Sequence, residues 1–429
     1  MSTVTAPLVF TEQKQTSRLQ ISLVILVALA IRLIVVFFTF RSLPDAEKHY
    51  EQFGWEIGWV ARSLADGHGF SSPFFRLSGP TALVPPLYPM LLSVLFRIFG
   101  VYSLSAGFVI LSVNSLLSAL TTIPVYFSAK YSLGIRGGNI AAWAWALYPF
   151  SIYFSACRVW EYALTALLFT TCFCIAQRIS YVSNPLSWIG FGLLYGVTAL
   201  SNPSVLSVMP FLLLYALWRV VPRDLRILRN GTLMVVTTVA VLIPWTLRNY
   251  HTLGIVCPVR DNYWLEFYAG NSGDNSDPNP ASAHPASNPA EMQEYLSLGE
   301  PAYLAEKRDL AIAHVSNHPL NFVGASLRRV VYYWSGFWSF SAEYREREPF
   351  EILNIFFCGG ITLLMLRGAL RFWWFSRSAF LPYLILIVFF PITYYLSHPL
   401  IDYRQPIEPA ILVLAIAGAF SFKSDCLIE

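Results

Sequence analysis

Long apolar runs separated by short polar segments extend along most of the chain. A helix that crosses a bilayer needs about 20 consecutive, mainly apolar residues, and most of these runs approach or exceed that length. The pattern therefore predicts an all-α polytopic membrane protein. The runs cover residues 19–41, 83–99, 105–129, 138–156, 159–178, 186–201, 203–221, 230–250, 349–371, 378–397 and 404–422.

Basic residues near the ends of the runs predict which side of the membrane each loop occupies, because cytoplasmic loops are enriched in Lys and Arg. The segments assigned to the cytoplasm on this basis are Lys130–Arg136, Arg219–Arg229, Arg367–Arg377, Arg178, Lys423, Lys14 and Arg18. The first apolar run is too long for the core of a signal peptide, so we expect an uncleaved first span.

The run at 83–99 is not expected to cross the membrane. An even number of crossings must separate Arg18 from Lys130, but three apolar runs lie between them. Run 83–99 is short, is interrupted by prolines and carries Arg97. We therefore expect it to lie in the outer interface, which leaves about ten transmembrane helices with both termini in the cytoplasm.

This topology divides the chain into four parts with two long outer segments. The parts are a cytoplasmic tail (1–18), an N-terminal membrane module with a first outer loop (19–250, loop 42–104), an outer lid region (251–348) and C-terminal membrane helices with a short tail (349–429). Helical spacing in the first outer loop predicts an amphipathic helix at Phe53, Ile57, Val60 and Leu64. A second helical pattern, at about 289–317, follows a loop rich in Gly, Asn, Asp and Pro.

Composition supports a membrane protein and excludes several other classes. Hydrophobic residues make up 55% of the chain and charged residues 13%, whereas soluble domains are about 25% charged. A soluble enzyme, a disordered protein and a fibrous protein are therefore excluded. The net charge of +4 comes from scattered basic residues, so nothing supports nucleic-acid binding. The six cysteines show no metal-ligand or disulfide pattern, and we interpret them as packing residues.

Candidate chemistry gathers on the predicted outer side, where polar residues stand at the ends of many separate spans. Ionisable groups at such positions are costly and are candidates for function. The residues are Asp45, Glu47, His49, Arg158, Glu161, Asn202, Arg248, Asn249, His398, Asp402, Tyr403 and Arg404.

Each of these residues also has a purely structural interpretation. Asp45 suits a helix N-cap, and Glu161 suits the positive end of a helix. Arg248 and Arg404 suit the membrane interface, where long basic side chains reach towards water. His398 alone suits a packed or solvated position, and Glu408 is either a buried structural acid or part of a site.

The combination points to chemistry more strongly than any one residue does. Arginine holds phosphate oxygens through paired donors. A carboxylate close to an acceptor hydroxyl can act as a general base. Two carboxylates and two arginines on one face therefore suit a phosphate-bearing substrate, and the membrane location suggests that a lipid carries the phosphate.

At these residues the chain resembles the GT-C superfamily of polyprenyl-phosphate-dependent glycosyltransferases, in particular the protein O-mannosyltransferase and aminoarabinose transferase (family 39-like) group. Five segments carry the resemblance in the expected order. They are PDAEKHYEQFGWEIGWVARSLADGHGF, GPTALVPPLYPMLLSVLFRIFG, YFSACRVWEYALTALLF, PWTLRNYHTLG followed by EFYAGN, and DYRQPIEPAILVLAIAG. Two positions depart from the family pattern: Asn202 precedes Pro203 where a basic residue is common, and Asp402 precedes Tyr403 where Arg is common.

The resemblance implies transfer of a sugar from a polyprenyl-phosphate donor to an acceptor on the outer face. It implies that the catalytic residues are Asp45, the base, and Glu161, which assists acceptor or sugar binding, and that Arg248, Arg404 and Tyr403 bind the donor phosphate. The expected substrate-binding residues are Glu47, His49, Arg158, Asn202, Asn249, His398 and Asp402.

The expected partners are the lipid-linked donor, the membrane and an acceptor of undefined class, and the expected location is a bacterial inner or plasma membrane. Carboxylates can also bind a divalent cation, but without a dedicated ligand cluster we expect no obligatory metal or other cofactor. Two other classes stay open: a transporter or flippase of lipid-linked intermediates, and a non-catalytic protein of envelope assembly.

Overall fold

The computed structural model describes residues 6–41, 53–218, 226–272 and 283–422, and these are helical apart from turns, loops and one bridge between Ser71 and Pro80. The predicted all-α class is confirmed. The helices are α1 (Ala6–Arg41), α2 (Trp55–Ala65), α3 (Leu87–Phe99), α4 (Leu104–Leu120), α5 (Thr122–Ala146), α6 (Pro149–Ala156), α7 (Tyr162–Ala176), η3 (Ile179–Tyr181), α8 (Pro185–Ser201), η4 (Pro203–Ser207), α9 (Met209–Trp218), α10 (Arg226–Leu253), α11 (Tyr263–Asn271), α12 (Pro289–Leu298), α13 (Glu300–Asn317), α14 (Pro319–Ser335), α15 (Ala342–Arg347), η6 (Glu351–Leu353), α16 (Asn354–Phe375), α17 (Arg377–Phe389), α18 (Ile392–Leu396), η7 (Ile401–Arg404) and α19 (Glu408–Ala419).

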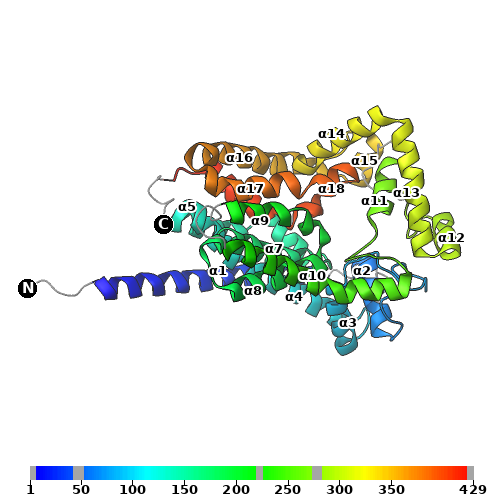
Figure 1. Ribbon diagram of the computed structural model, residues 1–429, viewed down its shortest axis with the longest axis horizontal. Coiled ribbons are helices and arrows are strands. Elements are labelled where there is room, and N and C mark those ends of the chain that lie inside the picture. The colour runs from blue at the N-terminus through cyan, green and yellow to red at the C-terminus, as the bar shows by residue number, and fades with distance from the viewer. Residues whose placement is uncertain (1–5, 42–52, 219–225, 273–282, 423–429) are drawn as a thin grey trace, which may run out of the picture.

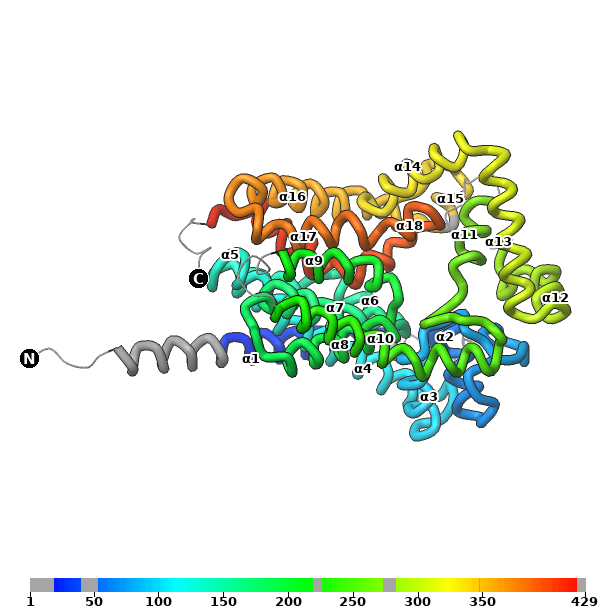
Figure 2. The backbone as a smooth tube through the Cα atoms, viewed as in Figure 1, coloured from blue at the N-terminus to red at the C-terminus, as the bar shows by residue number. Residues whose placement is uncertain are grey.

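The apolar helices form a bundle along the long axis of the molecule, and the more polar elements gather at one end of it. In Figure 1, α2, α3 and α11 to α13 all lie beyond that end. The tube in Figure 2 shows how the chain leaves α10, forms α11 to α13 and returns to the bundle through α14. This arrangement matches a membrane bundle that carries a lid.

Five helical stretches in the described residues are long and apolar enough to cross a membrane. They are Leu19–Thr39, Leu104–Ala146, Arg226–Leu253, Glu351–Phe375 and Arg377–Leu396. Shorter apolar helices cover most of the other predicted runs: Leu87–Phe99, Tyr162–Ala176, Pro185–Ser201, Pro203–Trp218 and Glu408–Ala419. The protein is therefore an integral membrane protein, whereas ten crossings and cytoplasmic termini stay predictions.

The basic segment predicted as a loop at Lys130–Arg136 contains a sharp break in α5. Gly134 has φ of 77°, a left-handed value that favours glycine, and helical geometry resumes after it. Downstream, Gly138 packs so closely on Tyr126 that an added Cβ would lie 3.0 Å from its ring. The chain thus folds back at this break, as the charge pattern requires.

Glycines allow the closest helix crossings in the bundle. A Cβ at Gly368 of α16 would lie 1.9 Å from the Leu414 carbonyl oxygen of α19, and one at Gly418 would lie 2.0 Å from the Leu364 carbonyl oxygen. Small residues at such crossings let helix backbones approach each other in a membrane, where water supplies no driving force. Helix α19 follows the segment, between α18 and α19, that brings His398 and Asp402 to the site.

Arg32 joins the first helix to the rest of the bundle. Its side chain is fully buried. Its Nη1 donates to the carbonyl oxygens of Ala28 and Ala146, both at 3.0 Å, and its Nη2 donates to Ser151 Oγ at 2.7 Å. A buried guanidinium is tolerated here because protein acceptors replace water.

The outer segments agree in part with the sequence patterns. The predicted amphipathic helix is α2, which buries Ile57 and Val60, and the run at 83–99 forms α3. The pattern at 289–317 forms two helices instead of one, because Gly299 between α12 and α13 has φ of 75°. The sequence pattern does not predict α11 or α14.

Glu300 attaches the lid to the first outer loop. Its carboxylate accepts hydrogen bonds from the Thr81 hydroxyl and the Ala82 amide, both at 2.5 Å, and from the Tyr295 hydroxyl at 2.8 Å. These three bonds satisfy a carboxylate that is almost fully buried. The lid is therefore held over the end of the bundle by a specific polar contact as well as by apolar packing.

Candidate functional site

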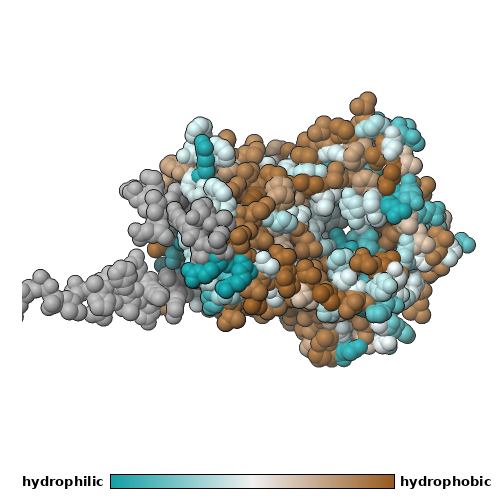
Figure 3. Space-filling model, viewed as in Figure 1, coloured by the Kyte–Doolittle hydropathy of each residue, from teal (hydrophilic) through white to brown (hydrophobic). Residues whose placement is uncertain are grey.

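Two adjoining cavities lie where the lid meets the end of the bundle. The larger encloses about 270 Å³ and the smaller about 210 Å³. In Figure 3 a hollow with hydrophilic residues opens in this region, between the surfaces over α10 and α18. Both cavities are lined by Arg260, Asn262, Glu266, Tyr394, His398 and Tyr403.

Carboxylates from four separate elements line the larger cavity. Glu56 comes from α2, Glu161 precedes α7, Glu266 lies on α11 and Asp402 lies in η7. Glu161 is only 4% exposed, and its Oε2 has no hydrogen-bond partner within the described residues. Such an atom is available to a ligand that enters the cavity.

Asp402 is held by the hydroxyl of Tyr162, which donates to its Oδ2. Its Oδ1 is buried and has no partner in the described part of the chain. Burial raises the pKa of Asp402, although the Tyr162 hydroxyl and the positive charge of Arg158 act in the opposite direction. Burial likewise raises the pKa of Glu56, with His284 opposing the shift.

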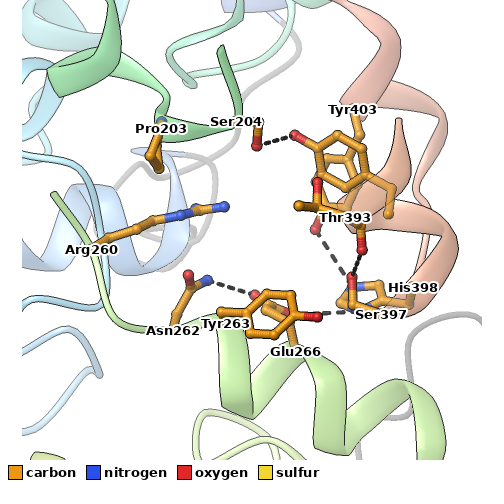
Figure 4. Close-up of a pocket in the computed structure, with 11 residues that line it drawn as sticks. Pro203, Ser204, Arg260, Asn262, Tyr263, Glu266, Thr393, Ser397, His398 and Tyr403 are labelled. Atoms are coloured by element: carbon orange, nitrogen blue, oxygen red, sulfur yellow. Dashed lines mark hydrogen bonds and ion pairs between the residues drawn. The ribbon is translucent and has the colours of Figure 1, made fainter. Parts of the chain in front are cut away.

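Two arginines face these carboxylates. Arg158 lines the larger cavity, and Arg260 lines both. In Figure 4, Arg260 extends into the smaller cavity from the side opposite Thr393 and His398. Among the described residues neither guanidinium has a hydrogen bond or ion pair, so both are free to hold an anionic ligand.

Histidines pair with two of the acids at the cavity wall. His398 Nδ1 lies 3.4 Å from Glu266 Oε2, and His284 Nε2 lies 3.5 Å from Glu56 Oε1. Asn262 Nδ2 donates to Glu266 Oε1 at 2.8 Å, which fixes the carboxylate that faces His398 (Figure 4). The lid residue Glu266 thereby lies next to His398, in the segment between α18 and α19.

The structure brings half of the sequence-predicted site residues together. Those that line the cavities are Arg158, Glu161, Asn202, His398, Asp402 and Tyr403. Asp45, Glu47 and His49 lie outside the described residues. The other three, Arg248, Asn249 and Arg404, do not line either cavity.

Arg248 and Asn249 attach loops to the end of α10. Arg248 donates to the carbonyl oxygens of Thr81 at 2.6 Å and Phe70 at 2.5 Å. Asn249 donates to the Cys257 carbonyl oxygen at 2.9 Å. The predicted roles in phosphate and substrate binding therefore have no geometric support, and a structural role is observed in their place.

Arg404 is also occupied within the protein. It is fully buried, its Nε lies 2.7 Å from Glu408 Oε1, and its Nη1 donates to the Trp334 carbonyl oxygen at 3.1 Å. The Tyr148 hydroxyl donates to the other oxygen of Glu408 at 2.8 Å. The Nη2 of Arg404 has no partner among the described residues, but Arg404 lines neither cavity, so we do not extend its predicted phosphate role to the proposal below.

Sequence reasoning missed Glu56, Arg260, Glu266 and His284. Glu56 lies on the predicted amphipathic helix, and Glu266 lies within the segment EFYAGN. Both residues therefore belong to segments that carry the family resemblance. Arg260 and His284 belong to the lid, where no periodic pattern placed them. No group of three or more His, Cys, Asp or Glu suited to a metal ion occurs in the described residues, and metal independence stays a prediction.

Comparison with known proteins supports the fold. Residues 83–247 match the model of the dolichyl-phosphate-mannose-protein mannosyltransferase family, which is less than half of the chain. No characterised protein matches the chain significantly in sequence.

Solved structures extend the likeness to nearly the whole chain. The Archaeoglobus fulgidus oligosaccharyltransferase tethered to an acceptor peptide matches 94% of this chain and 49% of its own, with 13% identity and a TM-score of 0.56. The complex of the same archaeon's oligosaccharyltransferase with an inhibitory peptide and dolichol-phosphate matches 94% and 50%, with 15% identity and a TM-score of 0.53. The chain thus spans about half the length of these enzymes.

ArnT from Cupriavidus metallidurans bound to undecaprenyl phosphate matches 93% of this chain and 77% of its own, with 12% identity and a TM-score of 0.40, which is too low to carry an argument. At these identities the matches establish the fold alone. The predicted resemblance to the GT-C superfamily is confirmed: the chain has a GT-C membrane fold.

Proposed function

From a GT-C fold with a charged cavity under its lid, we propose that the protein transfers a sugar from a polyprenyl-phosphate donor to an acceptor. The observation that carries the proposal is the pair of unpaired guanidinium groups, Arg158 and Arg260, in one cavity with Glu161 and Asp402. The lipid-phosphate and acceptor-peptide complexes of the structural neighbours support it.

The two cavities suit different parts of the reactants. Residues from the membrane helices, including Pro203, Thr393 and Tyr394, line the smaller cavity together with Arg260. We assign the lipid phosphate to this cavity, because a prenyl chain can remain in the bilayer while Arg260 binds the phosphate. The sugar and the acceptor would then occupy the larger cavity beside Glu161 and Asp402.

The reaction needs a base and a stabilised leaving group. The acceptor hydroxyl oxygen attacks the anomeric carbon, its proton passes to a carboxylate, and the bond from the anomeric carbon to the phosphate oxygen breaks. The polyprenyl phosphate leaves with the bonding electron pair, and Arg260 and Arg158 stabilise its negative charge. Asp45 remains the first proposed base, and Glu161 is the alternative among the described residues.

Three of the four predicted parts of the chain contribute residues to this site. The N-terminal membrane module supplies Glu161, the lid supplies Arg260 and Glu266, and the C-terminal helices supply His398 and Asp402. We propose that the site faces outward from a bacterial inner or plasma membrane and needs no obligatory metal. Cysteines introduced into the lid should therefore react with an impermeant thiol reagent in intact cells. Lid cysteines that stay unreactive in intact cells with unchanged transfer would contradict the outward orientation.

The test measures binding of undecaprenyl phosphate to the purified protein and transfer from polyprenyl-phosphate sugars. Arg260→Gln should weaken binding by about 10–100-fold, because a charge-assisted hydrogen bond contributes about 1.5–3 kcal/mol. Arg308→Gln is the matched control, since Arg308 is an exposed lid arginine paired with Asp309. Equal binding by both variants would refute the phosphate role of Arg260.

A transporter is not favoured by any described feature. Transporters bind substrate near the bilayer midplane between broken helices, whereas the charged cavities here lie at one end of the bundle under the lid. A non-catalytic envelope protein would bind the lipid phosphate without transfer, and the same assay distinguishes it.

A further inference from the structure

Helix α14 has the reverse of the amphipathic pattern expected for a helix in water. Its buried face carries Arg329 and the tyrosines Tyr332 and Tyr333. Its exposed residues include Leu320 at 85% exposure, Leu327 at 64% and Val331 at 66%, and the exposed polar side chains among them are Asn321 and Arg328. A helix that faced water would expose its polar residues and bury its leucines.

The polar face of α14 is fixed against the rest of the protein. Arg329 Nη1 donates to the Leu396 carbonyl oxygen at 3.1 Å, and its Nη2 donates to Asn271 Oδ1 at 3.0 Å. Tyr333 stacks on Tyr394 with ring centroids 6.1 Å apart. Because these contacts hold α14 in one orientation, the helix cannot turn its leucines inward.

The uncovered apolar face continues onto a membrane-spanning helix. Beyond α14, the exposed side chains of Phe350 (80%) and Phe356 (77%) extend the apolar surface onto α16, part of the candidate span Glu351–Phe375. Figure 3 shows hydrophobic residues along the part of the surface over α14. Continuity with a surface that faces lipid identifies lipid as what covers α14.

The interfacial helix α3 provides a parallel at the same end of the bundle. It exposes Met90, Val94 and Ile98 at intervals of four residues. In Figure 1, α3 and α14 lie at opposite margins of the end that carries the lid. Two helices with exposed apolar stripes at one level are expected where that level is the membrane surface.

We propose that α14 is embedded in the lipid surface, with Leu320, Leu327 and Val331 among the acyl chains. Helix α13 then rises from the membrane surface where it joins α14, and the smaller cavity lies level with the lipid head groups. This inference does not depend on the proposed function, because it concerns where the protein meets the bilayer.

The test uses the full-length protein in phosphatidylcholine liposomes that contain a phosphatidylcholine with a diazirine on its acyl chain. After irradiation, mass spectrometry locates the lipid adducts. We expect adducts on α14 at 320–331 at a yield within a few fold of α1, whose Leu23 and Leu26 are exposed on a candidate span. Helix α13 should give at least tenfold fewer.

Matched variants separate lipid contact from misfolding. Leu327→Glu should reduce the α14 adducts severalfold and leave the α1 adducts unchanged, whereas Leu310→Glu on α13 should change neither, although Leu310 is also exposed. Adducts on α1 and α16 with none on α14 would overturn the proposal. Crosslinks between two copies of the chain through 320–331 would overturn it as well, because a second copy would then cover this face.

Discussion

The guanidinium of Arg404 lies 2.7 Å from the carboxylate of Glu408, one turn further along the last membrane segment, and both side chains are almost fully buried. Removing one member leaves the other charge buried and unpaired, which costs about 3–5 kcal/mol. Arg404→Ala and Glu408→Ala should therefore each lower the free energy of unfolding by about that amount, measured by denaturation in detergent.

Arg158→Ala is the control for this pair, because Arg158 is exposed in the cavity and has no partner among the described residues. It should change stability by less than about 0.5 kcal/mol. A stable Arg404→Ala protein that fails only to bind lipid phosphate would restore the role predicted for Arg404 from the sequence.

Asp45 and Glu161 are the two carboxylates proposed as base. Asp45→Asn keeps the size and the helix-capping ability of the side chain, so its folding should be close to normal. Loss of a positioned base slows transfer by about 10²–10⁴-fold, with undecaprenyl phosphate binding unchanged. If Asp45→Asn retains full transfer and Glu161→Gln loses it, Glu161 is the base.

Gly270 is where the lid helix α11 touches the loop that carries His398. A Cβ there would lie 2.2 Å from the Ser397 carbonyl oxygen. Gly270→Ala should therefore force α11 away, at a cost of about 1–3 kcal/mol, and weaken the contact of Glu266 with His398. The readouts are the unfolding midpoint and the rate of transfer.

Gly324→Ala on α14 is the matched control, because nothing lies within 4 Å of its added Cβ. Alanine is the better helix former by up to about 1 kcal/mol, so this variant should be neutral or stabilised. Equal behaviour of the two variants would mean that α11 is free to move.

The lid should be held less firmly as pH rises. Burial and the neighbouring Glu300 raise the pKa of Asp261 to about 8, and burial raises the pKa of Glu300, with Arg248 opposing both shifts. The folded protein thus keeps these protons more tightly than the unfolded chain does. The associated stability is complete below about pH 4 and is lost as pH rises through about 8.

Unfolding midpoints at pH 6 and pH 9 check this dependence. The wild type should be less stable at pH 9, and Asp261→Asn should reduce the difference. Asp309→Asn, at an exposed lid position, should leave the difference as it is in the wild type. An Asp261→Asn protein with the full wild-type difference would exclude Asp261 as its source.

Hydropathy and charge predict most of the bundle, because membrane helices follow rules of length and sidedness that one sequence can show. The break at Gly134 inside Lys130–Arg136 is an example. The pattern does not predict α14, since its leucines and its arginine exchange the faces expected in water. The helical periodicity of a sequence cannot by itself show which face of the helix is buried, because that depends on whether water or lipid surrounds it.

The site is predicted less well, for a related reason. Glu161 and Arg404 both stand at the mouths of spans, yet one lines the cavity and the other is paired inside the protein. What distinguishes Arg404 is its partner Glu408, one helical turn away. In the sequence, the only sign of this pair is the spacing of four residues. Arg260 lies in the site because of how the lid folds, and no periodic pattern in the sequence predicts that fold.

The contacts of Arg32 have a consequence for how the protein is made. Its side chain enters the membrane with the first helix, but Ser151, one of its acceptors, is 119 residues further along the chain. Until α6 has been synthesised, the guanidinium lacks Ser151 as an acceptor, and a charged group in a membrane helix without its full set of partners is costly. We therefore expect the N-terminal module to close around Arg32 only once α6 has been synthesised.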